Sequence, residues 1–394
     1  MKKRILFVIS RMSIGGSQRS LVNALNVLDV EKYDVTLYVR ENKTELIPEI
    51  NGAVRVIVNE YPTDYERSPV SLAREALKRI LLVFKAKKAA ARTEEKAREY
   101  VVVKKTEYEK RAHPELSEGY DVAVSYLQGY TCRFTADVVK AERMICFYHN
   151  STDGTPGLHA EYLPKFDRIV TVAAETREML ASKYPSIAGK LTSIQNIIDT
   201  TGIKKKAGGF DVPHAEGKTV LCTCGRISPE KGYELAVEAA RKLAADGVPF
   251  KWFFIGDGPK DDEIKKQISD SGLEDRIELL GSKSNPYPWI KACDIYVQPS
   301  YEESQSLTIM EAQILRRPVV STATVGARGN LIDGKNGLLA DFTGEAIAQG
   351  IERLIDDPGL VRSFSEELKS RGFEEYNTRI KKQWVDLLEG KDEE

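Results

Sequence analysis

PSYEESQSLTIMEA, residues 299–312, links a predicted strand to a predicted helix. The mostly apolar run Asp294–Gln298 before it is typical of a buried strand, and Pro299-Ser300 favours a turn. The Ser304-Gln305-Ser306 run then offers side chains that cap a helix N-terminus. We therefore expect a strand–turn–helix unit, the building block of a parallel α/β sheet.

This helix start is suited to hold an anion between two carboxylates. Its first N–H groups, near Leu307 and Thr308, have no partner within the helix and carry the positive end of its dipole. If the chain is helical from Glu303 onward, Glu303 and Glu311 lie roughly 12 Å apart, at about 1.5 Å per residue. That is the span from a sugar ring to a ribose across a diphosphate. The pattern therefore indicates a nucleotide-sugar site, in which one carboxylate accepts hydrogen bonds from the sugar and the other from the ribose.

Strands and helices alternate along the rest of the chain, as in doubly wound parallel sheets. The first series has a helix at about 17–28 and the strands Arg4–Ser10, Val35–Val39, Val54–Val58, Asp121–Tyr126, Met144–Tyr148 and Arg168–Val172. The second series has the strands Thr219–Cys224, Trp252–Ile255, Ile277–Leu280, Asp294–Val297 and Val319–Ser321. At 394 residues, the chain is expected to form two α/β domains with a cleft between them. Ligands of such sheets bind beyond the carboxyl ends of the strands.

The domain boundaries follow from composition. The stretch Ala188–Glu216 has turn formers, a lysine run and no sustained periodicity, so we place a linker at 196–216, between domains at 1–195 and 217–372. The last part, 373–394, is predicted to be helical. Trp384 and its apolar neighbours could pack on the first domain, but an independent tail helix fits the sequence equally well.

The overall composition is that of a soluble globular protein, with 42% apolar and 30% charged residues. The net charge of −1 gives no basic field for nucleic acid, so we expect no nucleic-acid partner. The five cysteines are scattered without zinc-site spacing, and no signal peptide is recognisable. We therefore expect a cytoplasmic protein.

The segment from Glu303 to Glu311 resembles the E-x7-E element of retaining GT-B glycosyltransferases, in particular glycosyltransferase family 4. Ser304-Gln305-Ser306 replaces the glycine-aromatic-glycine of that family, which leaves the donor-sugar preference open. The resemblance covers nearly the whole chain and is absent from about Glu60 to Glu115. It implies a GT-B architecture of two Rossmann-like domains facing each other across a cleft. It also implies that Glu303 orients the donor sugar, Glu311 binds the ribose, and residues 304–308 line the donor.

Gly225-Arg226 and Lys231-Gly232 bring two cations to one turn between a predicted strand and helix. Two fixed positive charges can stabilise a diphosphate as it leaves. The run resembles the family's G-R-x4-K-G element, in which the Arg and Lys bind the donor diphosphate. Surface cations on a loop are the alternative.

Three further elements are assigned with the help of the resemblance. Gly15-Gly16, between the first strand and helix, lets amides face an anion. His149 ends a strand and matches the active-site histidine that binds a donor-sugar hydroxyl; a structural histidine is the alternative. Gly256 belongs to a G-x-G-P turn, and Ser282-Lys283 follow a strand and are expected around the base.

A helical insertion is expected at about 68–111. Its segment Arg74–Arg92 holds seven basic residues and one acid around an apolar core. Such a helix can lie on an anionic membrane surface, which would place the protein at the inner face of the cell membrane. A solvated helix packed on its own domain is the alternative.

Together these features predict a retaining glycosyltransferase that moves a sugar from a nucleotide-sugar donor to a glycan or lipid-linked acceptor. UDP is favoured over GDP because uridine donors are commoner in the resembled family. No metal or other cofactor is expected, since Arg226, Lys231 and a helix N-terminus supply the positive charge. Two alternatives stay open: a non-hydrolysing sugar-nucleotide epimerase on the same fold, and a non-catalytic nucleotide-sugar-binding scaffold.

Overall fold

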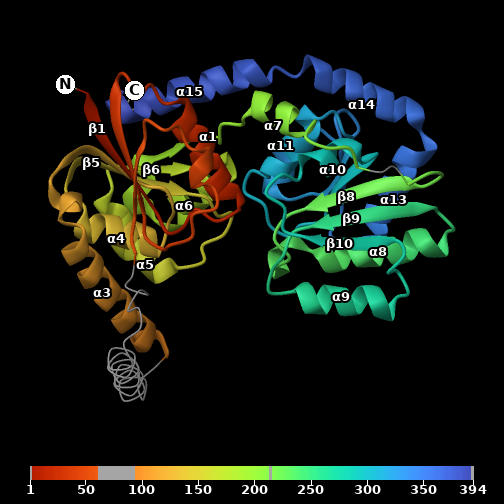
Figure 1. Cartoon of the computed structure of the whole chain (residues 1–394), viewed down its shortest axis with the longest axis horizontal. Helices are drawn as coiled ribbons and strands as arrows, with labels where there is room; N and C mark the ends of the chain where they lie inside the picture. The colour runs from red at the N-terminus through yellow and green to blue at the C-terminus, as the bar shows by residue number, and fades with distance from the viewer. Residues whose placement is uncertain (1, 61–93, 213–214, 392–394) are drawn as a thin grey trace.

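The computed structural model describes residues 2–60, 94–212 and 215–391. These residues form two α/β units that lie side by side, each a parallel sheet with helices against it (Figure 1). The predicted architecture of two Rossmann-like domains is therefore confirmed.

The first sheet has seven strands in the order β3-β2-β1-β4-β5-β6-β7. Their bounds are β1 (Lys3–Ile9), β2 (Tyr33–Val39), β3 (Arg55–Val58), β4 (Tyr120–Ser125), β5 (Ala141–Tyr148), β6 (Arg168–Thr171) and β7 (Leu191–Ser193). The helices of this part are α1 (Gly16–Val27), α3 (Glu94–Ala112), α4 (Tyr130–Val138), α5 (Pro156–Tyr162) and α6 (Ala174–Lys183). Every predicted strand of the first series is present, and β7 is an additional one.

The second sheet has six strands in the order β10-β9-β8-β11-β12-β13. Their bounds are β8 (Thr219–Cys224), β9 (Phe250–Ile255), β10 (Ile277–Gly281), β11 (Ile295–Gln298), β12 (Val319–Thr322) and β13 (Leu338–Ala340). The helices after the first sheet are α7 (Thr200–Lys206), α8 (Tyr233–Ala245), α9 (Asp261–Asp270), α10 (Tyr287–Ala292), α11 (Leu307–Ile314), α12 (Val325–Arg328), α13 (Gly344–Asp356), α14 (Pro358–Ser370) and α15 (Phe373–Glu389).

The strand orders determine where a ligand can enter. In the first sheet the direction of winding reverses at β1, which lies between β2 and β4; in the second it reverses at β8, between β9 and β11. Open parallel sheets bind ligands at such reversal points, beyond the carboxyl ends of the strands. The loops that follow β1, β8 and β11 carry the predicted glycine, cation and carboxylate motifs.

The C-terminal helices bind the two domains together. α14 lies on the second domain, and α15 crosses back to the first along one edge of the molecule (Figure 1). Four apolar residues of α15 are part of the first domain's core: Ile380, Trp384, Leu387 and Leu388. Trp384 stacks on Phe147 of β5 with ring centroids 4.7 Å apart. The terminal helix therefore packs on the first domain and is not an independent tail.

Part of the predicted linker is ordered helix. α7 begins at Thr200, where the Asp199 side chain accepts a hydrogen bond from the Gly202 N–H and caps the helix. Ile198, Ile203 and Ala207 are buried in the same core cluster as residues of α10 and α11. The sequence did not predict this helix, because seven residues are too few to show a helical pattern.

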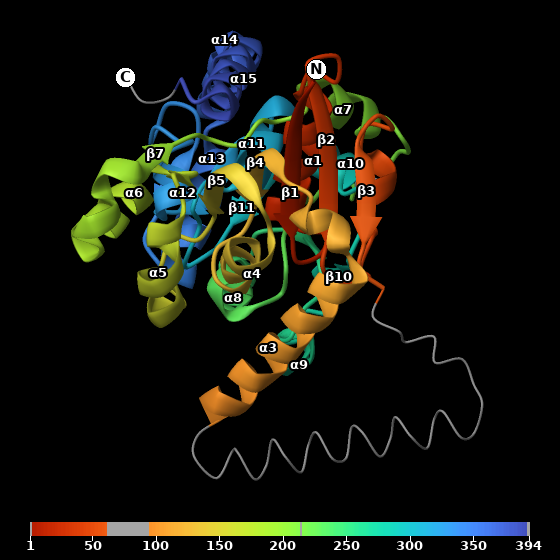
Figure 2. The same cartoon turned by 90° about the vertical axis from the view of Figure 1, so that its left-hand side faces the viewer.

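The helical insertion is described from Glu94 onward, as α3, which runs out from the body of the first domain (Figure 2). Its inner end is anchored by Glu109, whose carboxylate is fully buried and accepts hydrogen bonds from Arg40 at 2.9 and 3.0 Å. The basic segment Arg74–Arg92 lies outside the described residues. No helix in the described ranges is long and apolar enough to cross a membrane.

Candidate functional site

A cleft of about 700 Å³ lies between the two domains, at the carboxyl ends of both sheets. Its volume is in the range of small-molecule sites, roughly 300–1,000 Å³. The structure brings together in its wall every residue singled out from the sequence: Gly15, Gly16, His149, Arg226, Lys231, Gly256, Ser282, Lys283, Glu303, Ser304, Gln305, Ser306, Leu307, Thr308 and Glu311.

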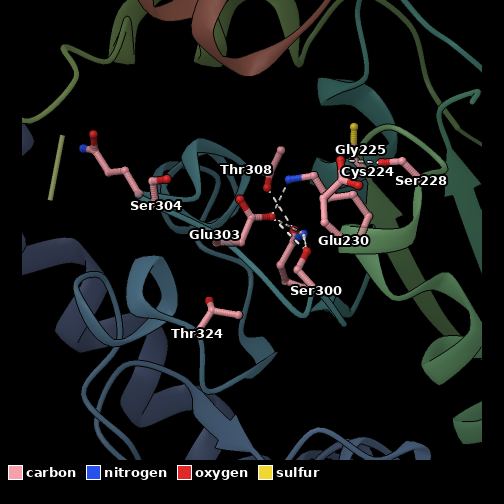
Figure 3. Close-up of polar contacts among 12 residues, drawn as sticks. Cys224, Gly225, Ser228, Glu230, Ser300, Glu303, Ser304, Thr308 and Thr324 are labelled. Atoms are coloured by element: carbon pink, nitrogen blue, oxygen red, sulfur yellow. Dashed lines mark hydrogen bonds and ion pairs between the residues drawn. The ribbon is translucent and has the colours of Figure 1, made fainter. Parts of the chain in front are cut away.

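Glu303 is held rigidly in this cleft. Its Oε1 accepts hydrogen bonds from Lys231 Nζ at 2.7 Å, Ser300 Oγ at 2.9 Å and Gln298 Nε2 at 3.0 Å. Figure 3 shows the side chains of Glu303 and Ser300 pointing toward one another. Because three donors fix one oxygen, the carboxylate orientation is set before any ligand binds.

The second oxygen of Glu303, Oε2, has no hydrogen bond or ion pair within the described part of the chain. It remains available to accept from a ligand hydroxyl.

The turn after β8 approaches its neighbours closely. Gly256, after β9, has φ of +150°, and a Cβ there would lie 1.8 Å from the Gly225 carbonyl oxygen. The φ of Gly232 is +60°, and a Cβ there would lie 2.1 Å from the Pro299 carbonyl oxygen. Glycine is therefore required at both positions, and the three loops that follow β8, β9 and β11 pack as one unit.

The two predicted cations of this turn differ in their surroundings. Lys231 is half-buried and forms the ion pair with Glu303. Arg226 is exposed on the cleft wall, and among the described residues its guanidinium has no hydrogen bond or ion pair, although its charge helps to lower the pKa of Glu230. Lys231 thus positions the Glu303 carboxylate, while the Arg226 guanidinium is available for an anion.

Helix α11 starts later than the sequence suggested. Residues Glu303–Ser306 form a loop, and the first helical residue is Leu307. Ser306 is the N-cap residue, but it has left-handed backbone angles (φ 52°, ψ 74°) and makes no side-chain cap hydrogen bond. The expected serine cap is therefore wrong, and the spacing estimate that assumed a helix from Glu303 does not apply.

Leu307 and Thr308, the first residues of α11, still line the cleft. The Ser306 hydroxyl is buried without a hydrogen-bond partner in the described structure. Serine is disfavoured at positive φ, and such backbone strain is concentrated at functional sites.

Ser304 and Gln305 join the two domains. Ser304 Oγ donates to the His149 backbone carbonyl at 2.6 Å. Gln305 Oε1 accepts from the Asn196 N–H at 2.7 Å, and its Nε2 donates to the Tyr376 hydroxyl at 2.9 Å. These bonds explain why residues 303–306 are not part of α11, because the side chains of Ser304 and Gln305 are hydrogen-bonded to the first domain, the linker and α15. Sequence reasoning gave Gln305 a role in donor binding and missed this bridging one.

His149 lies beyond the end of β5 in a desolvated position. Burial lowers the pKa of its imidazole to about 4, which a hydrogen bond with the Tyr126 backbone only partly offsets. The ring is therefore neutral at pH 7. Its Nε2 is buried and has no hydrogen-bond partner among the residues described. A neutral imidazole with one unpaired nitrogen can bind a hydroxyl group.

Glu311 is a buried residue of the cleft wall. Its Oε1 accepts a hydrogen bond from the Tyr287 hydroxyl at 3.2 Å. Burial raises the pKa of the carboxyl group to about 7, although the Arg19 charge acts to lower it. Arg19 comes from α1 of the first domain and is ion-paired with Glu49. The charge of Arg19 in the first domain thus acts on the pKa of Glu311 in the second domain.

Several cleft residues were not anticipated from the sequence. They are Ser10, Arg11, Ile14 and Arg19 around the glycine loop, Thr152 after β5, and Glu230, Asp257, Tyr287 and Glu302 in the second domain. Thr152 Oγ1 donates across the cleft to Glu302 at 3.2 Å. Arg11 and Arg19 flank Gly15-Gly16 beyond the end of β1, and this position in the sequence could have identified them as cleft residues. Tyr287 could not have been found in this way, because it contacts Glu311 only through tertiary packing.

The comparisons with known proteins relate part of this chain to glycosyltransferases. Residues 206–371 match the family described as Glycosyl transferases group 1. The chain is 32% identical over 154 residues to an alpha-D-kanosaminyltransferase of Streptomyces kanamyceticus, covering 38% of this chain and 40% of that protein. It is 28% identical over 210 residues to a Campylobacter jejuni N-acetylgalactosaminyltransferase that acts on a diphospho-undecaprenol acceptor, covering 53% of this chain and 56% of that protein. The chain thus spans about half or less of the length of these curated relatives.

Solved structures agree over nearly the whole chain. Anabaena HepE, in complex with UDP and glucose, has a TM-score of 0.70 at 17% identity and covers 98% of this chain and 99% of its own. TarM has a TM-score of 0.73 at 12% identity, with 98% and 99% covered. The fold is the GT-B fold of these glycosyltransferases, and the second domain carries the group 1 glycosyltransferase sequence pattern.

Proposed function

We propose that this protein is a glycosyltransferase that transfers a sugar from a UDP-sugar to a glycan or lipid-linked acceptor with retention of the anomeric configuration. The observation that carries this proposal is the cleft arrangement of Glu303, Lys231, Arg226, the start of α11 and Glu311. The match of residues 206–371 to the group 1 family supports the activity. The UDP found in HepE and TarM complexes supports the nucleotide.

In this proposal the donor lies along the second domain. Glu311 accepts from the ribose, the base lies by Ser282-Lys283, and the free oxygen of Glu303 accepts from the sugar hydroxyls. His149 offers Nε2 to a sugar hydroxyl from the opposite wall. Because both domains contribute to one ligand, donor binding closes the cleft and excludes water.

Departure of the diphosphate is the step that these residues assist. The developing negative charge is stabilised by Arg226, by Lys231 and by the unpaired amides at the start of α11. Fixed charges of this kind act without a divalent metal, and we propose that none is needed. The acceptor hydroxyl then attacks from the face that the nucleotide leaves, with the departing phosphate taking the proton, which retains the configuration.

The acceptor binds on the first domain in this proposal. The relatives' names include a diphospho-undecaprenol acceptor and a poly(ribitol-phosphate) acceptor, both parts of cell-surface glycan assembly. We propose a role of that general kind, at the cytoplasmic face of the membrane.

Release of UDP from a UDP-sugar, with and without membrane or glycan extracts as acceptor, tests the activity. The proposal predicts release that depends on acceptor, together with label incorporated into the glycan fraction. Sugar interconversion without net UDP release would indicate an epimerase instead. Binding of the donor without release under any condition would indicate a scaffold.

Glu311→Gln gives a separate test of the ribose assignment. We expect roughly tenfold weaker binding of the nucleotide sugar at pH 8, because a hydrogen-bonded charged acceptor is lost. In the wild type the pKa of about 7 should make binding about tenfold weaker at pH 6 than at pH 8, since the carboxyl group must lose its proton. The variant should bind equally at both pH values. Calorimetric titration measures this; an unchanged affinity in Glu311→Gln would remove the ribose role.

The same pKa predicts a stability effect. The pKa of Glu311 is about 7 in the folded protein and about 4.5 in the unfolded chain. The protonated carboxyl group therefore contributes its full stability below about pH 4.5, and this contribution is lost as the pH rises through about 7. Glu311→Gln should therefore raise the melting temperature more at pH 8 than at pH 5.

A further inference from the structure

Gln298, the last residue of β11, has a buried polar side chain behind the wall of the cleft. It is 2% exposed and is not one of the residues that line the cleft. Burial of an amide group is costly unless the group is hydrogen-bonded, so buried amides are found where they have partners. The partners of Gln298 therefore show what this side chain holds in place.

The amide of Gln298 uses all of its hydrogen-bonding capacity. Its Oε1 accepts from the Tyr296 hydroxyl at 2.8 Å and from Thr308 Oγ1 at 2.9 Å. Its Nε2 donates to Ser300 Oγ at 2.7 Å and to Glu303 Oε1 at 3.0 Å. An amide oxygen has two lone pairs and an amide nitrogen has two hydrogens, so every position is occupied. Buried networks that are fully satisfied in this way rigidify the groups they join.

Three segments of the cleft wall meet at this amide. Glu303 is the residue that we assign to the donor sugar, and Thr308 is the second residue of α11, whose start we assign to the diphosphate. The Tyr296 hydroxyl also lies 3.2 Å from the carbonyl oxygen of Cys224, which ends β8 two residues before Arg226. One buried side chain thus connects the sugar and diphosphate parts of the proposed donor site with the turn after β8.

The loop before α11 gives this connection its importance. Residues 303–306 are not helical, and α11 begins at Leu307, so helical geometry does not fix Glu303 relative to the helix start. Gln298 spans the gap, because its amide binds Glu303 with the nitrogen and Thr308 with the oxygen. It does so from β11, a strand that lies between β8 and β12 inside the sheet. A site supported by such a rigid element is held more precisely than one on a loop alone.

We propose that Gln298 is a positioning residue for sugar transfer, which fixes the Glu303 carboxylate relative to the start of α11. This inference rests on the proposed function, because it takes Glu303 as the residue that binds the donor sugar. The sugar and the diphosphate are the two sides of the bond that breaks. An error in their relative placement therefore slows the chemical step more than it weakens binding of the nucleotide. Gln298 acts through Glu303 and Thr308 and does not itself touch the substrate.

Gln298→Met tests the proposal, since methionine has a similar length and makes none of the four hydrogen bonds. We expect kcat to fall roughly 10²-fold, the scale of a small misplacement of reacting groups. The Kd of UDP should change by no more than about twofold, because UDP lacks the sugar that Glu303 binds. Steady-state kinetics with the UDP-sugar that is active in the release assay measures kcat. Calorimetric titration with UDP measures the Kd, and its stoichiometry gives the folded fraction to which kcat is referred.

Gln298→Glu adds a readout that does not depend on a loss of packing, because it is nearly isosteric. The introduced carboxyl group would face Glu303, which is paired with Lys231, and the Tyr296 hydroxyl, whose pKa is raised by burial. It can donate to Glu303 only while it is protonated, and two adjacent carboxyl groups raise the pKa of one of them. The ratio of the variant's kcat to that of the wild type should therefore fall several-fold from pH 6 to pH 8. A ratio close to one at pH 8 would overturn the proposal.

Gln313→Met is the matched control. Gln313 is a fully buried glutamine of α11 that donates to the Asn330 carbonyl at 3.1 Å, accepts from Arg371 and does not line the cleft. Its variant should turn over like the wild type for each folded molecule. Equal kcat in Gln298→Met and wild type, an equal loss in Gln313→Met, or a loss of UDP affinity as large as the loss of kcat would overturn the proposal. If the wild type binds no UDP or turns over no UDP-sugar, the proposed function itself fails, which is a distinct result.

Discussion

Lys231→Ala should lower kcat by roughly 10²-fold or more, with a much smaller change in donor affinity. The ammonium group lies 2.7 Å from Glu303 Oε1 and on the cleft wall where we place the leaving diphosphate. Removal of one preorganised group that stabilises developing charge costs about 10²–10³-fold in kcat. The loss should fall on kcat because this charge develops only as the sugar–phosphate bond breaks.

Steady-state kinetics with the identified donor measures this effect. Lys265→Ala is the matched control, since Lys265 is an exposed lysine of α9 in the same domain and does not line the cleft. It should turn over like the wild type. A double variant with Glu303→Gln should lose less than the product of the two single losses, because the two side chains act as a pair. Near-wild-type turnover in Lys231→Ala would remove this residue from the mechanism.

Trp384→Ala should destabilise the protein by about 3–5 kcal/mol, as large-to-small changes of buried aromatic residues do. The side chain is 2% exposed and belongs to α15, yet it packs in the core of the first domain. It stacks on Phe147, two residues before His149. The change should therefore also loosen the wall that carries His149.

Denaturant unfolding measures this loss of stability. Lys381→Ala, an exposed position on the same helix, should stay within about 0.5 kcal/mol of the wild type. Trp384→Phe should recover part of the loss, because a smaller ring still fills much of the space. If Trp384→Ala unfolds like the control, α15 does not contribute to the core of the first domain.

The strands could be predicted because their signals are local. Apolar runs such as Ile5–Ile9 are buried on both faces of a parallel sheet, so they differ clearly from the helices around them. The glycine, cation and carboxylate motifs follow strands β1, β8 and β11, and the topology of an open sheet brings strand ends together. Their common position in one cleft could therefore be expected from order along the chain.

The parts that were missed depend on tertiary contacts. Gln305 bonds to Asn196 and Tyr376, which are distant in the sequence, and this competes with the helical conformation that its neighbours favour. Ser306 adopts a left-handed conformation that serine does not favour by itself. The α7 helix derives its stability from burial of Ile203 rather than from a sequence pattern.

The distinction between Arg226 and Lys231 also required the structure. The sequence placed both at one turn, but only coordinates show that Lys231 is paired with Glu303 and that Arg226 is exposed.

The central claim, that the cleft is a nucleotide-sugar site, is tested most directly by thermal unfolding in the presence of UDP, GDP, ADP and their sugar conjugates, without added metal. A ligand at 100 times its Kd adds about 2.7 kcal/mol of stability, which shifts the melting temperature measurably. We predict stabilisation by UDP and UDP-sugars, reduced in Glu311→Gln, and little effect of GDP or ADP. Absence of a shift with every nucleotide at millimolar concentration would contradict the account.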